Sequence, residues 1–183
     1  MTPNNKRSTG TEFCLETFPN QVIYFAGPDV FYPNYNETIA LIKNQCENYG
    51  FWPLIPGEEI ISDPKLIFQK NIQAIQRADG IVANLNPFRG QEPDSGTVFE
   101  LGYGYSLGKW IIGYQDDPRP LIEKLKPLAL GPNQGRLPDQ TLVEDFGYPV
   151  NLMLGVALTA VVSSLAEALK MVETFGHPKK SRR

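Results

Sequence analysis

The sequence has few of the residues that bind metals or form disulfides. It contains two cysteines, Cys14 and Cys46, without a CxxC pair, and a single histidine, His177. A zinc site usually takes a set of Cys, His or acidic ligands, and a disulfide framework needs patterned cysteines. We therefore expect no metal site and no disulfide. Reduced thiols of this kind are typical of a cytoplasmic protein.

Long apolar runs and clusters of positive charge are also lacking. Residues 1–20 do not contain the apolar stretch of a secretory signal, so we interpret them as a flexible N-terminal arm. The most apolar long segment, 152–169, is interrupted by polar side chains and is too polar for a membrane span. The net charge of −3 gives no reason to expect a nucleic-acid polymer as partner, and the basic tail at 176–183 is short.

The composition is that of a globular protein. Hydrophobic residues make up 42% and charged residues 20% of the chain, which excludes a wholly disordered or fibrous protein. A chain of 183 residues can bury enough surface to fold around one core. We expect a single domain over residues 21–175.

Strand and helix signals alternate along this domain. Short apolar runs that end near glycine or proline predict strands at 21–26, 51–55, 80–85 and 110–114. Apolar spacing of three and four residues, capping residues and N-terminal proline predict helices at 35–49, 64–78, 96–108 and 150–174. The segment 115–149 shows only a helical turn at 121–125. This order predicts an α/β fold, with a flavodoxin- or Rossmann-like parallel sheet and helices on both faces.

The loops that follow the strands are the candidate ligand-binding loops. In an open parallel sheet, ligands bind beyond the carboxyl ends of the strands. The relevant segments are 27–34, 86–95 and the chain from 115 onward. We interpret Arg89 as a solvated or salt-bridged side chain rather than a phosphate contact. Asp79, just before the third strand, is interpreted as a turn cap rather than a substrate contact.

Two carboxylates mark the helix at 96–108. Asp94 lies at its start and Glu100 in its first turns, where the positive end of the helix dipole is expected to keep a carboxylate ionised at neutral pH. Paired carboxylates of this kind can serve as the nucleophile, Glu100, and the acid, Asp94, of glycosyl chemistry. The structural alternative is a capping box, because Thr97-x-x-Glu100 matches that pattern.

The segment 94–109, DSGTVFELGYGYSLGK, resembles the active-site helix of the nucleoside 2-deoxyribosyltransferase family. That family carries an Asp, five intervening residues, Glu-Leu-Gly-Tyr and a Gly-Lys end. The resemblance implies that Glu100 is the nucleophile that forms a covalent deoxyribosyl intermediate. It also implies that Asp94 binds and protonates the nucleobase.

Other blocks of the sequence extend the resemblance to about 22–153. Tyr24 lies in a segment similar to the family's first strand, whose Tyr bonds the nucleophile, and Asn71 falls where the family often has a base- or sugar-contacting Asp or Asn. The segment 149–153, PVNLM, resembles an element whose Asn reaches the neighbouring subunit's site and binds the sugar 5'-hydroxyl. This implies that Asn151 and Met153 contact substrate and that the protein is a homo-oligomer.

The remaining predicted substrate contacts lie in two loops. They are Gly27, Asp29 and Phe31 after the first strand, and Ser95 and Gly96 at the start of the Glu100 helix. Of Phe31 and Trp52, Phe31 is the better candidate to stack on a base, because it lies in a ligand-binding loop. The first loop is one residue longer than in the compact transferases, and the chain continues past Met153, where the small transferases end in a short tail.

The resemblance implies a transferase that moves 2-deoxyribose between free nucleobases, with deoxynucleosides as substrates. No metal or organic cofactor is expected, because a protonated base is already a good leaving group. Two alternatives remain open at this point. One is a hydrolase that cleaves deoxynucleoside 5'-monophosphates, although Pro28 and Asp29 do not favour phosphate binding. The other is a nucleotide sensor without catalytic activity.

Overall fold

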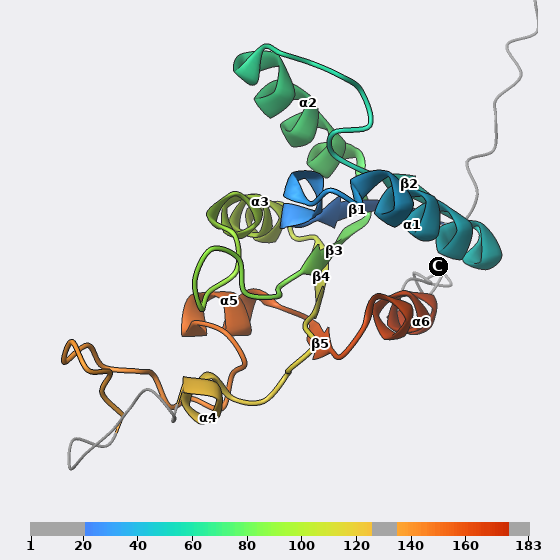
Figure 1. The fold of residues 1–183 in the computed structure, drawn as a ribbon. Coiled ribbons are helices and arrows are strands. Elements are labelled where there is room, and N and C mark those ends of the chain that lie inside the picture. Colours follow the sequence, from blue (N-terminus) through green and yellow to red (C-terminus); the bar gives the residue numbers. More distant parts are fainter. Residues whose placement is uncertain (1–20, 126–134, 176–183) are drawn as a thin grey trace, which may run out of the picture.

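One parallel sheet organises the molecule (Figure 1). The computed structural model describes residues 21–125 and 135–175, so the predicted arm at 1–20 and tail at 176–183 lie outside the described residues. The sheet has five strands in the order β2-β1-β3-β4-β5, and all neighbouring pairs are parallel. This is the flavodoxin-like strand order, and it confirms the predicted fold class.

The helices and strands follow one another in near-strict alternation. The strands are β1 (Gln21–Ala26), β2 (Phe51–Leu54), β3 (Gly80–Asn84), β4 (Trp110–Tyr114) and β5 (Ala160–Val162). The helices are α1 (Tyr35–Tyr49), α2 (Pro64–Arg77), α3 (Ser95–Ser106), α4 (Leu121–Leu125), α5 (Leu152–Ala157) and α6 (Leu165–Phe175), with a short 3-10 helix, η1 (Pro28–Phe31), after β1.

Local sequence explains where the helices begin and end. Asp63 caps α2, because its carboxylate accepts a hydrogen bond from the Lys65 N–H at 2.9 Å, and Pro64 occupies the first helical position. At the other end of a helix, Gly50 terminates α1 in the left-handed region with φ of 70°. These signals are readable in the sequence, which is why the predicted ends of α1 and α2 agree closely with the structure.

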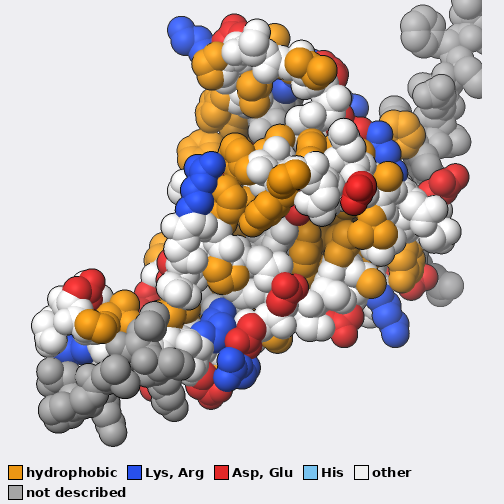
Figure 2. Space-filling view, in the orientation of Figure 1, with side chains coloured by type: hydrophobic (Ala, Val, Ile, Leu, Met, Phe, Trp, Pro, Cys, Tyr) orange, Lys and Arg blue, Asp and Glu red, His pale blue; other side chains and the backbone are white. Residues whose placement is uncertain are grey.

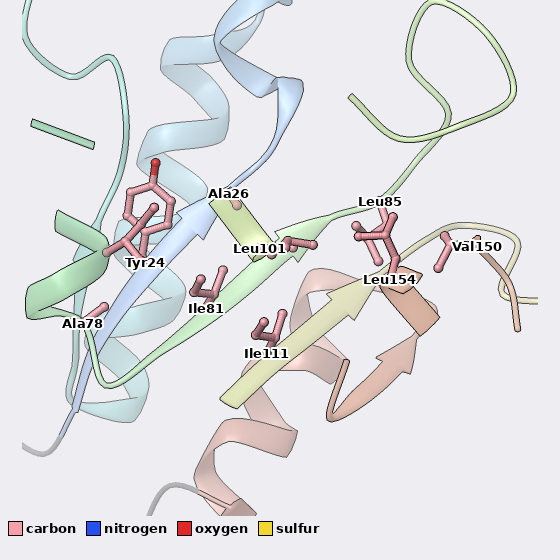
Figure 3. Close-up of a cluster of buried hydrophobic side chains, with 11 residues drawn as sticks. Tyr24, Ala26, Ala78, Ile81, Leu85, Leu101, Ile111, Val150 and Leu154 are labelled. Atoms are coloured by element: carbon pink, nitrogen blue, oxygen red, sulfur yellow. The ribbon is translucent and has the colours of Figure 1, made fainter. Parts of the chain in front are cut away.

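Alternate residues of each strand face the two helical layers. On one side of the sheet, Tyr24, Ile81 and Ile111 pack with residues of α2, α3 and α5, as Figure 3 shows. The other face of the same strands packs against α1 and α6, and Ile112 belongs to that cluster with Cys46. The sheet is therefore buried on both faces, which fits strands that read as continuous apolar runs.

The prediction of one long helix at 150–174 is wrong. The chain leaves α5 at Leu158 and adds β5 to the sheet, where the Thr159 N–H donates to the Ile111 carbonyl at 2.7 Å. A new helix, α6, then begins with a capping box. The Glu167 carboxylate accepts from the Ser163 N–H at 3.0 Å, and the Ser164 hydroxyl accepts from the Glu167 N–H at 3.3 Å.

The physical reason is that the β-branched pair Val161–Val162 suits a strand and the serines suit a helix start, which outweighs the apolar helical period. None of the helices in residues 21–125 and 135–175 is long and apolar enough to cross a membrane.

The strand order places a topological switch point at a defined position in the sheet. β1 pairs with β2 on one side and β3 on the other, so the connections leave in opposite directions at the carboxyl ends of β1 and β3. Such a switch point is where open α/β sheets bind ligands. The residues that follow Ala26 and Asn84 are therefore the first to examine.

Candidate active site

Glu100 lies where β1, α2 and α3 meet. Its carboxylate oxygen Oε1 accepts a hydrogen bond from the Tyr24 hydroxyl at 2.6 Å and another from the Asn71 side-chain amide at 3.3 Å. Tyr24 belongs to β1, Asn71 to α2 and Glu100 to α3, so three separate elements converge on one oxygen. The structure thus brings together three of the residues that the sequence singled out.

The helix cap at this site is Asp94 rather than Glu100. One oxygen of the Asp94 carboxylate accepts from the Thr97 N–H at 2.9 Å and from the Thr97 hydroxyl at 3.2 Å. Glu100 points instead to Tyr24 and Asn71, so the capping-box interpretation of Thr97-x-x-Glu100 is wrong. The helix therefore does not need the Glu100 carboxylate for its own termination.

Burial changes the acidity of Glu100. Desolvation raises the pKa of this carboxyl from 4.5 to about 7, the hydrogen bonds from Tyr24 and Asn71 lower it, and the negative charge of Asp94 raises it. Burial therefore opposes the helix dipole, which we expected to keep Glu100 ionised at neutral pH. Glu100 is the sixth residue of α3, beyond the first turn in which the dipole acts, and burial is the larger effect.

Tyr24 is held as a hydrogen-bond donor. Burial raises the pKa of its phenol far above the ordinary value of 10.0, and the neighbouring Glu100 carboxylate raises it further. The ring is packed in the core cluster with Ile81, and Figure 3 shows the hydroxyl at the outer end of the ring. A rigid ring with a permanently protonated hydroxyl can only donate to the carboxylate that faces it.

Polar side chains gather at the carboxyl ends of β1 and β3. The Asp29 carboxylate accepts from the Asn84 amide at 3.0 Å, and the Asn84 oxygen accepts from the Asn86 N–H at 3.1 Å. Burial raises the pKa of Asp29. A Cβ on Gly27 would lie 2.4 Å from the Asp29 carboxylate and 2.9 Å from the Asn84 Cβ, so only glycine allows this close approach.

Sequence reasoning missed Asn84 and Asn86. The available signal was a polar residue that ends an otherwise apolar strand, at the edge of the sheet where ligands bind.

An aromatic cluster lies between the first loop and the loop after β3. The Phe31 ring, which is 57% exposed, stacks on Phe88 with centroids 5.4 Å apart. The Arg89 guanidinium lies over both rings, at 5.1 Å from the Phe31 centroid and 4.6 Å from the Phe88 centroid. Arg89 was expected to be solvated or salt-bridged, but it makes cation–π contacts, because two exposed rings offer it a face.

Other predicted residues take the following places. Ser95 and Gly96 are exposed in the first turn of α3, beside Asp94. Asn151 caps α5, and Met153, 74% exposed, follows it. The hydrogen bonds of the Asn151 amide are to its own segment, with the Met153 N–H at 2.9 Å and with Glu144. Asp79 was expected to cap the helix-to-strand turn, but its carboxylate accepts from the Val22 N–H of β1 at 2.8 Å.

The geometry can be compared with known families at this point. The nucleoside 2-deoxyribosyltransferase family model matches residues 23–153, which run from β1 into α5. The chain belongs to the nucleoside 2-deoxyribosyltransferase family. The matched range includes Tyr24, Asn71, Asp94, Glu100 and Asn151.

Two solved structures are similar to this chain. A 2-desoxiribosyltransferase from Leishmania mexicana superposes with a TM-score of 0.74 at 37% identity, over 84% of this chain and 97% of that one. A 2-deoxyribosyltransferase from Bacillus psychrosaccharolyticus has a TM-score of 0.53 at 17% identity, over 81% and 90%, which shows a shared fold.

A protein of Schizosaccharomyces pombe, C191.05c, is 32% identical over 114 residues. These are 57% of this chain and 54% of that protein, so the chain spans about half the length of this curated relative.

The raised pKa of Glu100 predicts a stability difference that depends on pH. The folded protein binds this proton more tightly than the unfolded chain, so the favourable contribution is full below about 4.5 and is lost as pH rises through about 7. Glu100→Gln keeps an oxygen that can accept from Tyr24 and Asn71. We expect this variant to be more stable than the wild type at pH 8, by about 1–3 kcal/mol.

Urea unfolding at pH 8 and pH 5 measures this difference, which should shrink toward zero at the lower pH. Glu173→Gln, an exposed position on α6, is the matched control and should show no pH-dependent gain. An equal difference for Glu100→Gln at both pH values would contradict the burial argument.

Proposed function

We propose that the protein transfers the 2-deoxyribosyl group between nucleobases through a covalent ester on Glu100, and that it does so in the cytoplasm. The observation that carries this proposal is the Glu100 carboxylate itself. It is partly buried, does not cap α3, and is oriented by Tyr24 and Asn71 through hydrogen bonds of 2.6 and 3.3 Å. A carboxylate that is desolvated and precisely aimed has the properties of a nucleophile.

The reaction is a double displacement. A Glu100 oxygen attacks the anomeric carbon, the bond from that carbon to the base nitrogen breaks, and its electron pair leaves with the base, which takes a proton from Asp94. A second base then attacks the same carbon, the ester bond breaks, and the proton released by the incoming base returns to Asp94. Two inversions at one carbon give net retention.

The hydrogen bonds of Glu100 indicate which oxygen attacks. Tyr24 and Asn71 both donate to Oε1. We therefore assign the attack to Oε2, while Oε1 keeps the two donors throughout. Because the same donors favour the ionised carboxyl, they also offset part of the burial that raises the pKa of Glu100 to about 7.

The substrate is assigned as an unphosphorylated deoxynucleoside. The loop after β1 contains Pro28, which lacks an N–H, followed by the partly buried carboxylate of Asp29. Neither group favours a 5'-phosphate, which supports a nucleoside over a nucleoside monophosphate. Phe31, exposed in the same loop, offers a face on which a base can stack. Ser95 and Gly96 complete the proposed contacts at the start of α3.

A homo-oligomer is part of the proposal. Exposed hydrophobic side chains lie on neighbouring helices, with Phe99 and Tyr105 on α3 and Met153 and Val156 on α5. Figure 2 shows hydrophobic side chains grouped across the middle of one face of the molecule. A covering subunit would shield such side chains from water, and it would carry Asn151 and Met153 to the site of its neighbour.

Transfer is tested with deoxyinosine and free adenine. We expect deoxyadenosine to form without added metal or cofactor, and Glu100→Ala to lower the rate by at least about a thousandfold, because the covalent step is lost. Chromatography of the products measures both. Rapid base release from deoxynucleoside monophosphates without an acceptor would favour the hydrolase. No exchange, with Glu100→Ala binding nucleosides as the wild type does, would favour the sensor.

The pH profile tests the role of Tyr24. Because Glu100 must be ionised to attack, we expect kcat/KM to rise with pH through about 7. Tyr24→Phe removes a hydrogen bond that lowers the pKa of Glu100, so this acidic limb should move up by about one pH unit. Tyr49→Phe, on the opposite side of the sheet, is the control and should leave the limb in place. An unmoved limb in Tyr24→Phe would refute the proposed coupling.

Subunit mixing tests whether Asn151 acts across an interface. Glu100→Ala and Asn151→Ala should each have low activity, yet a mixed oligomer contains sites with Glu100 from one subunit and Asn151 from the other. We expect about half of the wild-type rate per mixed dimer, and so about a quarter of it for a mixture in which the subunits pair at random. If the mixture only averages the two parents, Asn151 does not act in a neighbouring site.

A further inference from the structure

We propose that Glu144 is a positioning residue that fixes the Asn151 amide so that it presents an N–H donor to the 5'-hydroxyl oxygen of the sugar. This inference rests on the proposed function, because it takes Asn151 as the sugar-binding residue. It adds a residue that the sequence did not single out, and it specifies the direction of the hydrogen bond between protein and substrate.

The Glu144 carboxylate accepts hydrogen bonds from the Asn151 side chain and from the backbone of the next residue. One of its carboxylate oxygens accepts from the Asn151 side-chain N–H, and the other accepts from the Leu152 N–H at 2.6 Å. The Leu152 N–H is the first of α5 and has no partner within the helix. Glu144 therefore holds the helix start and the Asn151 side chain with a single carboxylate.

The segment that carries Glu144 is anchored at both ends. Val143, just before it, is buried against α4. At the other end, the Pro149 carbonyl accepts from the Lys124 ammonium at 2.5 Å, and Val150 is buried in the core. The position of the Glu144 backbone is thus set by packing on α4 and on the sheet rather than by its own contact with Asn151.

The contacts leave one orientation for the Asn151 amide. A carboxylate offers only acceptors, so the NH2 group must face Glu144, and the Met153 N–H, at 2.9 Å, must face the oxygen. A flipped amide would set oxygen against oxygen and N–H against N–H. One N–H of the NH2 group is used by Glu144, and the second is the donor that remains for a ligand.

This orientation determines what the sugar must offer. A donor on Asn151 requires an acceptor on the substrate, and a 5'-hydroxyl oxygen supplies one. A 5'-ammonium group offers only donors and should be rejected. Without Glu144, the amide can turn over and present its oxygen, so discrimination between the two groups should relax.

The test compares substrates within one variant. Glutamine has nearly the same shape as glutamate, but in Glu144→Gln one acceptor oxygen becomes an NH2 group that faces a donor. We expect kcat/KM for 2'-deoxyadenosine, with a free base as acceptor, to fall about tenfold, mainly through KM. For 2',5'-dideoxyadenosine, which lacks the 5'-hydroxyl, the same variant should stay within about twofold of the wild type. The ratio of the two substrates is unaffected by the fraction of protein that is folded.

Two further measurements sharpen the result. In an Asn151→Ala background, Glu144→Gln should no longer change the ratio between the 5'-hydroxyl and 5'-deoxy substrates, because Glu144 affects recognition of the 5'-hydroxyl through Asn151. The wild type should prefer 2'-deoxyadenosine over its 5'-amino-5'-deoxy analogue, and Glu144→Gln should narrow that preference about tenfold. Asp145→Asn, at the adjacent exposed position, is the matched control and should leave every ratio unchanged.

The outcomes separate this inference from the proposed function. If the wild type exchanges bases but Glu144→Gln slows the 5'-hydroxyl and 5'-deoxy substrates equally, the positioning role is refuted and the transferase proposal stands. If the wild type exchanges no base at all, the proposed function fails and this inference fails with it. A loss confined to the 5'-hydroxyl substrate supports both.

Discussion

The contact between the Tyr24 hydroxyl and the Glu100 carboxylate is the interaction on which the rest of the site depends. It joins the first strand to the third helix across 76 residues of sequence, at 2.6 Å. Taking a carboxylate out of water is costly, and hydrogen bonds that favour its ionised form offset part of that cost. These opposing effects put the pKa of Glu100 at about 7, so both the ionised and the protonated carboxyl are accessible near neutral pH.

The sheet makes these contacts possible because it fixes the positions of the elements that carry Tyr24, Asn71 and Glu100. β1 and β3 are neighbours with opposite crossover directions, and they bring the end of β1, the start of α3 and the side of α2 together. The side chains around Glu100 are consequently held by core packing rather than by flexible loops. Tyr24 is at once a core residue and a hydrogen-bond donor to Glu100, so core packing fixes the ring that carries the donor.

Much of this arrangement could be predicted from the sequence, because it depends on local signals. Proline at the start of α2, glycine after α1 and the apolar run of β1 each act through nearest neighbours, and their elements were placed well. The exception was 150–174, where the apolar helical period hid the strand signal of Val161–Val162 and the helix-start signal of the serines that follow. Pairing with β4 adds to those local preferences. The acidity of Glu100 could not be predicted either, since burial is a property of the assembled core. Arg89 and Asn84 likewise depend on partners far away in the sequence.

The two edges of the sheet have a consequence for how this protein can associate. β5 has only three residues, and β2 has four, one of which, Pro53, lacks an N–H that could pair with another strand. Both edges are therefore poor templates for a further strand from another molecule. Copies of this chain cannot readily join their sheets into one continuous ribbon, so contact between them must use helical surfaces, where it leaves every strand register undisturbed.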